Sequence, residues 1–137
     1  MISACLLGVN CKYDGGNNRL PDETIGKLVS QYELIPVCPE CYGGLTTPRT
    51  PSERLGDRVV SKTGVDVTAQ FNKGAEAALY LARLFNVKTA ILKANSPSCG
   101  IGTIYDGTFT GTLAGGDGVT AELLKAHGIK IMNENAL

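Results

Sequence analysis

The feature that most constrains the fold of this chain is the alternation of short apolar runs with segments of helical periodicity. Such runs are typical of buried strands. Strands that alternate with helices along a chain predict a parallel, three-layer α/β sheet with right-handed crossovers. We therefore expect a Rossmann-like α/β domain, with a short and mostly parallel sheet of about four strands. The four apolar runs are residues 2–6, 34–37, 87–94 and 129–132.

Three segments between these runs carry helix signals. A helix is expected to open at Pro21, where Asp22 and Glu23 place acidic side chains in its first turn. The clearest helix follows Thr68, which is a good N-cap residue. A last helix is expected to begin at Asp117 or Thr120 and to end at Gly128 as a C-cap. The long helix has one apolar stripe, formed by Phe71, Ala75, Ala78, Leu79, Ala82 and Phe85.

Other segments predict local structure outside the main sheet. Residues 58–67 are expected to form a small β-hairpin with its turn at Thr63 and Gly64. Residues 41–56 contain several glycines and prolines, and residues 100–118 are rich in glycine, so we expect both segments to form loops. We expect residues 1–137 to form a single α/β domain, because no composition break or internal repeat interrupts the sequence.

Composition excludes several classes of partner. The 13 basic and 13 acidic side chains give a formal net charge of zero, so we expect no binding to a nucleic acid polymer. A free base remains an acceptable small ligand, because it has no phosphates to neutralise. The sequence has no stretch of 18 apolar residues, and we expect no membrane partner. The apolar start lacks the positive flank of a signal peptide, which indicates a cytoplasmic location.

The five cysteines are the strongest functional signal in the sequence. An odd number of cysteines in a reducing compartment indicates metal binding or redox chemistry rather than a disulfide framework. Cys5, Cys38 and Cys99 each lie at or just after the end of a predicted strand. Because the carboxyl ends of parallel strands share one edge of a sheet, these cysteines should converge there. Three convergent thiolates among glycine-rich loops favour an iron–sulfur or other soft-metal centre over three buried apolar side chains.

Two alternatives remain open from the residues alone. Cys38 and Cys41 have the C-x-x-C spacing of a zinc-binding structural module or of a thiol–disulfide redox protein. The sequence has no second pair of this kind, and Tyr42 and two glycines follow Cys41 where a redox motif would open a long helix. The sole histidine, His127, lies at a helix end, where it would serve the helix dipole rather than bind a metal.

Two polar residues near the cysteines are candidates for chemistry. Glu40 follows Cys38 by two positions, and a carboxylate beside an anionic metal centre would suit a general base near neutral pH. The competing interpretation is an ordinary surface glutamate. Ser96 precedes Cys99 by three positions and could orient a water molecule or ligand, although a serine before a proline is also typical of turns.

Seven segments, taken together and in this order, are similar to the signatures of a known family across nearly the whole chain. The sequence resembles the thiouracil desulfidase family, which was long classed as a domain of unknown function. The matching segments are Ser3-Ala-Cys-Leu-Leu-Gly, Cys11-Lys-Tyr-Asp-Gly, Pro36-Val-Cys-Pro-Glu, Gly44-Leu-Thr-Thr-Pro-Arg, Gly64-Val-Asp-Val-Thr, Ser96-Pro-Ser-Cys-Gly and Tyr105-Asp-Gly-Thr-Phe-Thr-Gly.

The resemblance implies a [4Fe–4S] cluster held by three cysteines, with one iron left open. By position these ligands are Cys5, Cys38 and Cys99, and the catalytic residues are Glu40 and Ser96. Cys11 also falls in a matching motif, although three ligands suffice. Cys41 departs from the family pattern, which leaves room for a disulfide or for alternative ligation.

The resemblance also implies a reaction, which is the non-redox desulfuration of a thiolated pyrimidine such as 2-thiouracil. The open iron would take the sulfur, Glu40 would activate the attacking water and Ser96 would hold it. The products would be uracil and hydrosulfide. The expected partner is thus a small thiolated nucleobase or a related compound, and the sequence specifies neither the physiological substrate nor the oligomeric state.

Overall fold

The computed structural model describes residues 1–137, and its central element is a four-stranded parallel sheet. This confirms the predicted α/β fold. Because β1 has β2 on one side and β5 on the other, the strand order reverses at β1, and a ligand site is expected beyond the carboxyl ends of these strands. The spatial order is β2 (Pro36–Val37), β1 (Ile2–Ser3), β5 (Thr89–Leu92) and β8 (Lys130–Asn133).

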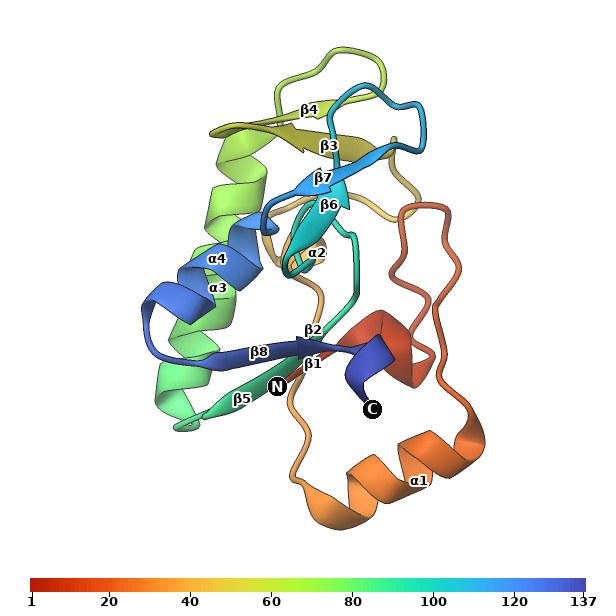
Figure 1. Cartoon of the computed structure of the whole chain (residues 1–137), viewed down its shortest axis with the longest axis vertical. Coiled ribbons are helices and arrows are strands. Elements are labelled where there is room, and N and C mark those ends of the chain that lie inside the picture. The colour runs from red at the N-terminus through yellow and green to blue at the C-terminus, as the bar shows by residue number, and fades with distance from the viewer.

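Helices cover both faces of this sheet and make it the middle of three layers (Figure 1). Successive residues of β5 point to opposite faces, as in any strand. Ala90 and Leu92 pack with residues of α3 and α4, whereas Ile91 packs with Leu28 of α1. The helices are α1 (Asp22–Gln31), the short α2 (Pro39–Tyr42), α3 (Thr68–Leu84) and α4 (Val119–Ala126), with two 3₁₀ turns, η1 (Ala4–Leu7) and η2 (Glu134–Ala136).

The three predicted helices are present, and the one difference is the residue that caps the N-terminus of α3. Thr68 is the first residue of α3, but its hydroxyl accepts the N–H of Val59 instead of capping the helix. The carboxylate of Asp66 accepts the N–H of Thr68 in its place. Gly128 follows α4 with φ of +82°, the left-handed conformation expected after a helix C-terminus.

The prediction that residues 58–67 form a hairpin is wrong, because the first half of this segment pairs with a strand before it and not with the second half. β4 (Arg58–Ser61) pairs with the preceding β3 (Ser52–Leu55) through a turn at Gly56 and Asp57. The downstream segment makes only an isolated bridge between Val60 and Asp66. The β3–β4 pairing is favoured because Gly56 adopts the φ of +62° that a tight turn requires without a steric penalty. As a result, β3 pairs with β4 along its whole length.

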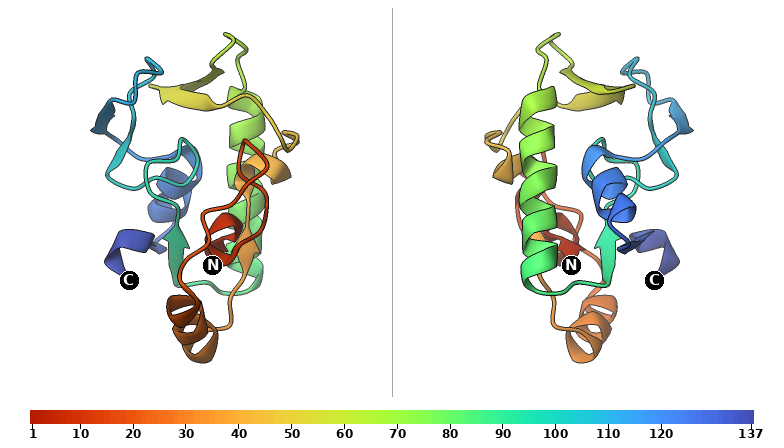
Figure 2. Two further views of the ribbon diagram at one scale, coloured as in Figure 1. Left: turned by 90° about the vertical axis from the view of Figure 1, so that its right-hand side faces the viewer. Right: turned by 90° about the vertical axis from the view of Figure 1, so that its left-hand side faces the viewer.

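Residues 100–118 also contain structure that the sequence did not predict. β6 (Thr103–Tyr105) and β7 (Leu113–Gly115) form a second antiparallel hairpin. Only Ile104 of its six strand residues is buried, so the apolar pattern that normally indicates a strand is missing. Figure 2 shows this hairpin and the β3–β4 hairpin beyond the arrowhead ends of the sheet, at the end opposite α1.

Close backbone contacts fix the loops that follow the strands. An ideal Cβ at Gly74 of α3 would lie 1.8 Å from the carbonyl oxygen of Pro39, so α2 approaches α3 too closely for any side chain. A Cβ at Gly118 would lie 2.5 Å from the carbonyl oxygen of Ser98, beside Cys99. These two glycines allow helices α3 and α4 to hold the segments that carry Glu40 and Cys99.

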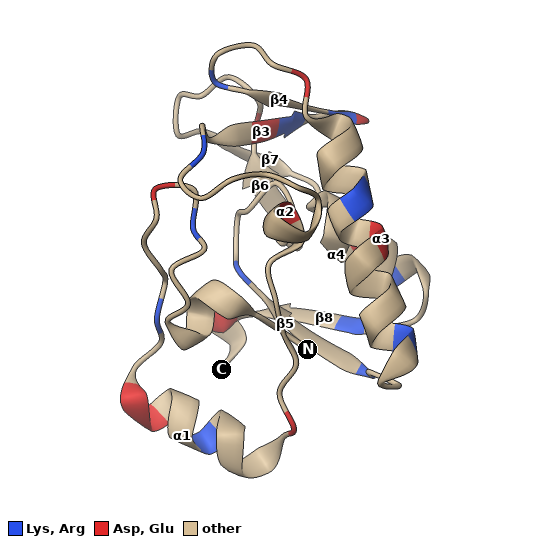
Figure 3. Cartoon of the chain, turned by 180° about the vertical axis from the view of Figure 1, so that it is seen from behind, with Lys and Arg blue, Asp and Glu red and all other residues tan.

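Charged side chains of both signs are interspersed along the chain (Figure 3). None of the helices is long and apolar enough to cross a membrane.

Candidate functional site

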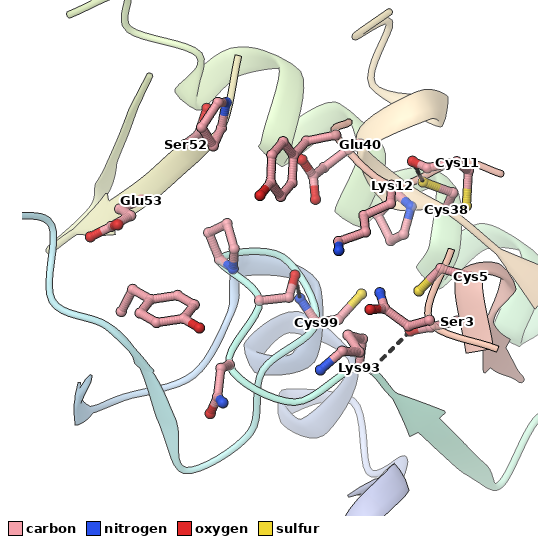
Figure 4. Close-up of a pocket in the computed structure, with 18 of the residues that line it drawn as sticks. Ser3, Cys5, Cys11, Lys12, Cys38, Glu40, Ser52, Glu53, Lys93 and Cys99 are labelled. Atoms are coloured by element: carbon pink, nitrogen blue, oxygen red, sulfur yellow. Dashed lines mark hydrogen bonds between the residues drawn. The ribbon is translucent and has the colours of Figure 1, made fainter. Parts of the chain in front are cut away.

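A pocket of about 500 Å³ lies beyond the carboxyl ends of β1, β2 and β5. Its wall combines residues from the sheet edge with residues from both hairpins, which are far apart in the sequence. Figure 4 shows Glu40 and Lys12 directed into this space, the cysteines on one side and Glu53 on the other. The site therefore lies where parallel α/β sheets generally bind ligands.

Four of the five cysteines line this pocket, and all five are free thiols. Cys5 lies in η1 directly after β1, and Cys38 lies between β2 and α2. Cys99 lies in the loop after β5. The structure thus brings Cys5, Cys38 and Cys99 to one pocket, as the strand ends predicted. Figure 4 shows the sulfurs of Cys5 and Cys99 directed toward one another.

The other two cysteines differ in position. Cys11 lines the pocket, and its carbonyl oxygen accepts a bond from the Cys38 thiol with an S···O distance of 3.7 Å. Cys41 does not line the pocket, and its sulfur lies 3.5 Å from the hydroxyl of Thr47. Only one sulfur of the C-x-x-C pair therefore lines the pocket, while Cys41 lies in α2 as a hydrogen-bonding neighbour of the Cys38 thiol.

Burial is the largest effect on the pKa values of the pocket thiols. It raises the pKa of Cys99 to about 12, against a weaker opposing effect of a hydrogen bond with Ser3. Burial also raises the pKa of Cys38 and of Cys5. These thiols would lose their protons on binding a metal, because the thiolate is the ligand.

Glu40 lies in the first turn of α2, and its side chain is 19% exposed. Burial raises the pKa of its carboxyl, and the nearby Arg49 guanidinium opposes that shift. Arg49 Nε lies 3.2 Å from one carboxylate oxygen, Oε1. The second oxygen, Oε2, is left available to the pocket. Glu40 is therefore a held carboxylate of the pocket wall, and the surface-loop interpretation is wrong.

Arg49 is a site residue that the analysis of the sequence missed. Its side chain is only 7% exposed, and its guanidinium bonds to Glu40, to the carbonyl oxygen of Cys11 at 2.8 Å and to the hydroxyl of Thr47 at 2.9 Å. One cation thereby joins the loop after β1 to the loop after β2. The sequence signal was its place in a segment that resembles a family signature, but no spacing rule connects it to Glu40.

Ser96 lines the pocket and also organises the loop that carries Cys99. Its hydroxyl oxygen accepts the N–H of Ser98 at 3.1 Å and that of Cys99 at 3.0 Å. The turn interpretation is therefore correct. The hydroxyl proton is not used in these bonds, so Ser96 can still donate it to a molecule in the pocket.

Three lysines, Lys12, Lys62 and Lys93, add positive charge to the pocket. Lys93 follows β5, and its ammonium pairs with Glu134 at 2.8 Å. The Lys12 ammonium lies 3.7 Å from the carboxylate of the exposed Asp14 and 5.6 Å from the centre of the Tyr13 ring. Together with Arg49 the three lysines place four cations around a pocket whose thiols become anionic when they bind a metal. His127 does not line the pocket, and its ring bonds to the carbonyl oxygen of Leu123 at the end of α4.

The donor set fits an iron–sulfur cluster. Thiolates are the usual protein ligands of such clusters, and three cysteines from three adjacent strand ends surround one pocket. No three His, Cys, Asp or Glu side chains are grouped closely enough to hold a single metal ion. The zinc-module alternative therefore has no support in the structure.

Comparisons with known proteins agree with this chemistry. The family described as 2-thiouracil desulfurase matches residues 1–136. A Bacillus subtilis (strain 168) protein, uncharacterized protein YbbK, is 42% identical over 147 aligned positions, which cover 100% of this chain and 96% of that protein. A solved structure of the [4Fe-4S]-dependent thiouracil desulfidase TudS superposes with a TM-score of 0.95 at 45% identity, covering 99% of this chain and 90% of that one. The chain therefore belongs to the 2-thiouracil desulfurase family.

Proposed function

We propose that this chain removes sulfur from a thiolated pyrimidine such as 2-thiouracil, using a [4Fe–4S] cluster held by Cys5, Cys38 and Cys99. One observation carries the proposal. The three cysteines and Glu40 line a single pocket at the edge where three parallel strands end. The similar structure TudS is described as a [4Fe-4S]-dependent thiouracil desulfidase, and this arrangement would supply thiolate ligands for such a cluster beside a carboxylate.

The cluster, when bound, would supply an open iron as a Lewis acid for the sulfur of the substrate. Glu40 would take a proton from the attacking water through its free carboxylate oxygen, while Arg49 holds the other oxygen. Ser96 would donate its hydroxyl proton to the same water and keep it in line with the ring carbon. The oxygen of water replaces sulfur on that carbon, the C–S bond breaks and hydrosulfide leaves, with no net transfer of electrons.

The pocket and the charge of the chain support a free base as substrate. Its volume of about 500 Å³ suits a cluster with a single heterocycle beside it. The formal net charge of zero gives no field to attract a nucleic acid polymer. Five unpaired thiols also suit a reducing compartment, and we infer a cytoplasmic location.

The test is to purify and reconstitute the protein without oxygen and to supply 2-thiouracil. We expect about four iron atoms per chain, and uracil and hydrosulfide released in equal amounts. Glu40→Gln should keep iron content and visible absorption while the desulfuration rate falls about a hundredfold or more, the usual scale for losing a general base.

A matched control separates the loss of a base from the loss of any surface charge. Glu76→Gln, on the exposed side of α3, should leave the rate unchanged. If cluster-loaded wild-type protein leaves 2-thiouracil intact, the proposal that 2-thiouracil is a substrate is wrong. A Glu40→Gln variant as fast as wild type would refute the role of Glu40.

A further inference from the structure

Phe109 has a backbone conformation that bulky residues rarely adopt. It lies in the loop between β6 and β7 with φ of +58°, in the left-handed region that favours glycine. A bulky side chain persists there only when its surroundings hold it and its position serves a purpose. Phe109 belongs to none of the three buried hydrophobic clusters, so core packing does not explain its position.

Glu53 holds this loop from a different hairpin. One of its carboxylate oxygens accepts the N–H of Gly107 at 2.9 Å and the N–H of Phe109 at 3.1 Å. Glu53 is buried on β3, with 9% of its surface exposed. A buried carboxylate with two backbone donors is a strong, directional anchor. The β3 strand therefore fixes the loop in the conformation that presents Phe109.

Phe109 and Glu53 line the same pocket as the cysteines and Glu40. Figure 4 shows Glu53 and Cys5 on opposite sides of this pocket. A substrate bound between them would therefore have its sulfur toward the cysteines and its ring toward the β6–β7 loop. Phe109 is half-buried and apolar, and a planar heterocycle gains free energy by stacking on such a face.

We propose that Phe109 is a specificity-determining residue that offers its ring as a stacking face for the heterocycle of the thiolated base, with Glu53 as the residue that positions it. The inference rests on the proposed function and adds the recognition of a flat aromatic ring. Stacking acts on the ring in both the ground state and the transition state, so it contributes to binding more than to turnover.

The experiment compares Phe109→Ala with Phe109→Tyr and with a matched control, Phe85→Ala. Phe85 lies at the end of α3 and is 57% exposed. Steady-state kinetics with 2-thiouracil and calorimetric binding of uracil are both measured on cluster-loaded protein. Phe109→Ala should raise KM and the Kd for uracil by about 5- to 150-fold, the range for losing one base–aromatic stack. The value of kcat and the iron content should stay within about twofold, because an interaction lost equally from both states leaves kcat unchanged.

Two further variants test the positioning role of Glu53. Glu53→Ala removes the acceptor and should reproduce the KM and Kd increases of Phe109→Ala. Glu53→Gln keeps an acceptor oxygen in place and should restore most of the binding. Phe109→Tyr keeps an aromatic face and should therefore avoid most of the KM and Kd increase of Phe109→Ala, whereas Phe85→Ala should behave as wild type.

The outcomes distinguish this inference from the function on which it rests. A wild-type protein that binds uracil but does not desulfurate 2-thiouracil would contradict the proposed function, and the uracil Kd of Phe109→Ala would still decide the stacking role. Unchanged KM and Kd in Phe109→Ala would overturn the inference, as would an equal loss in Phe85→Ala. A fall in kcat and iron content with no change in Kd would also overturn it.

Discussion

Arg49 shows how much of the site depends on single side chains that join loops. Its guanidinium is nearly fully buried and contacts groups from two different strand ends, so it both supports the pocket and aims Glu40. A planar guanidinium makes several directional bonds at once, whereas an ammonium is a single point of charge. Charge alone therefore does not reproduce its function.

We predict that Arg49→Lys keeps the cluster but lowers kcat for 2-thiouracil by about tenfold or more, since Glu40 is then held less accurately. Iron content and kinetics measured on the same preparation check this. Lys73→Arg, at an exposed position of α3, is the control for a change of cation elsewhere. Arg49→Lys with wild-type kcat would show that the charge is sufficient.

The cysteines give a second prediction at the residue scale. Cys5→Ala, Cys38→Ala and Cys99→Ala should each lose the cluster, because each removes one of three ligands. Cys41→Ala should retain about four iron atoms per chain, since Cys41 does not line the pocket. Cys11→Ala should also retain them, because the substitution keeps the Cys11 carbonyl oxygen that accepts the bond from Cys38.

Iron and sulfide analysis after anaerobic reconstitution reads out all five variants. Retention of iron by Cys99→Ala together with its loss from Cys41→Ala would contradict the ligand assignment.

At the scale of elements, the site depends on how closely α2 approaches α3. Gly43 and Gly74 face the other helix's backbone at distances that leave no room for a Cβ. The result is a helix of only four residues with a fixed position, although four residues are too few to be stable alone. Glu40 is placed by α3 as much as by its own segment.

We predict that Gly74→Ala destabilises the fold by about 2 kcal/mol or more, because the new methyl group must displace the backbone at Pro39. Desulfuration should fall with it, since α2 carries Glu40. Gly26→Ala in α1 is the matched control. A Cβ there meets no atom within 4 Å, so the change should stabilise the protein by up to about 1 kcal/mol.

Urea denaturation of the two variants measures the difference. Equal free energies of unfolding would mean that α2 shifts without cost and does not need this contact.

For the whole molecule, the sheet and the site are partly independent. The two largest hydrophobic clusters pack on opposite faces of the sheet, and Cys99 is the only pocket cysteine within the buried set of either. Most of the apolar surface that stabilises the fold is therefore buried whether or not an iron–sulfur cluster is bound.

We predict that removing the cluster with a chelator leaves the far-UV circular dichroism spectrum unchanged but lowers Tm. A group that binds only the folded state stabilises it, and each ~1 kcal/mol lost lowers Tm of a chain of this size by about 3 to 5 °C. Collapse of the spectrum on removal would show instead that folding requires the cluster.

The sequence by itself determined the parallel sheet, its helices and the meeting of three cysteines. Short apolar runs record burial directly, and parallel strands bring their carboxyl ends to one edge wherever they lie in the chain. The family resemblance added the cluster and the reaction. Cys5, Cys38 and Cys99 were predicted to share a site for these reasons.

Only the tertiary structure decided which polar groups hold one another. Arg49 with Glu40, and Glu53 with the loop of Phe109, are contacts between separate segments, and no periodicity records them. The hairpins were missed or misplaced for a related reason. β3 is Ser-Glu-Arg-Leu, a polar strand whose buried glutamate is satisfied by a distant loop, so burial there left no apolar pattern in the sequence.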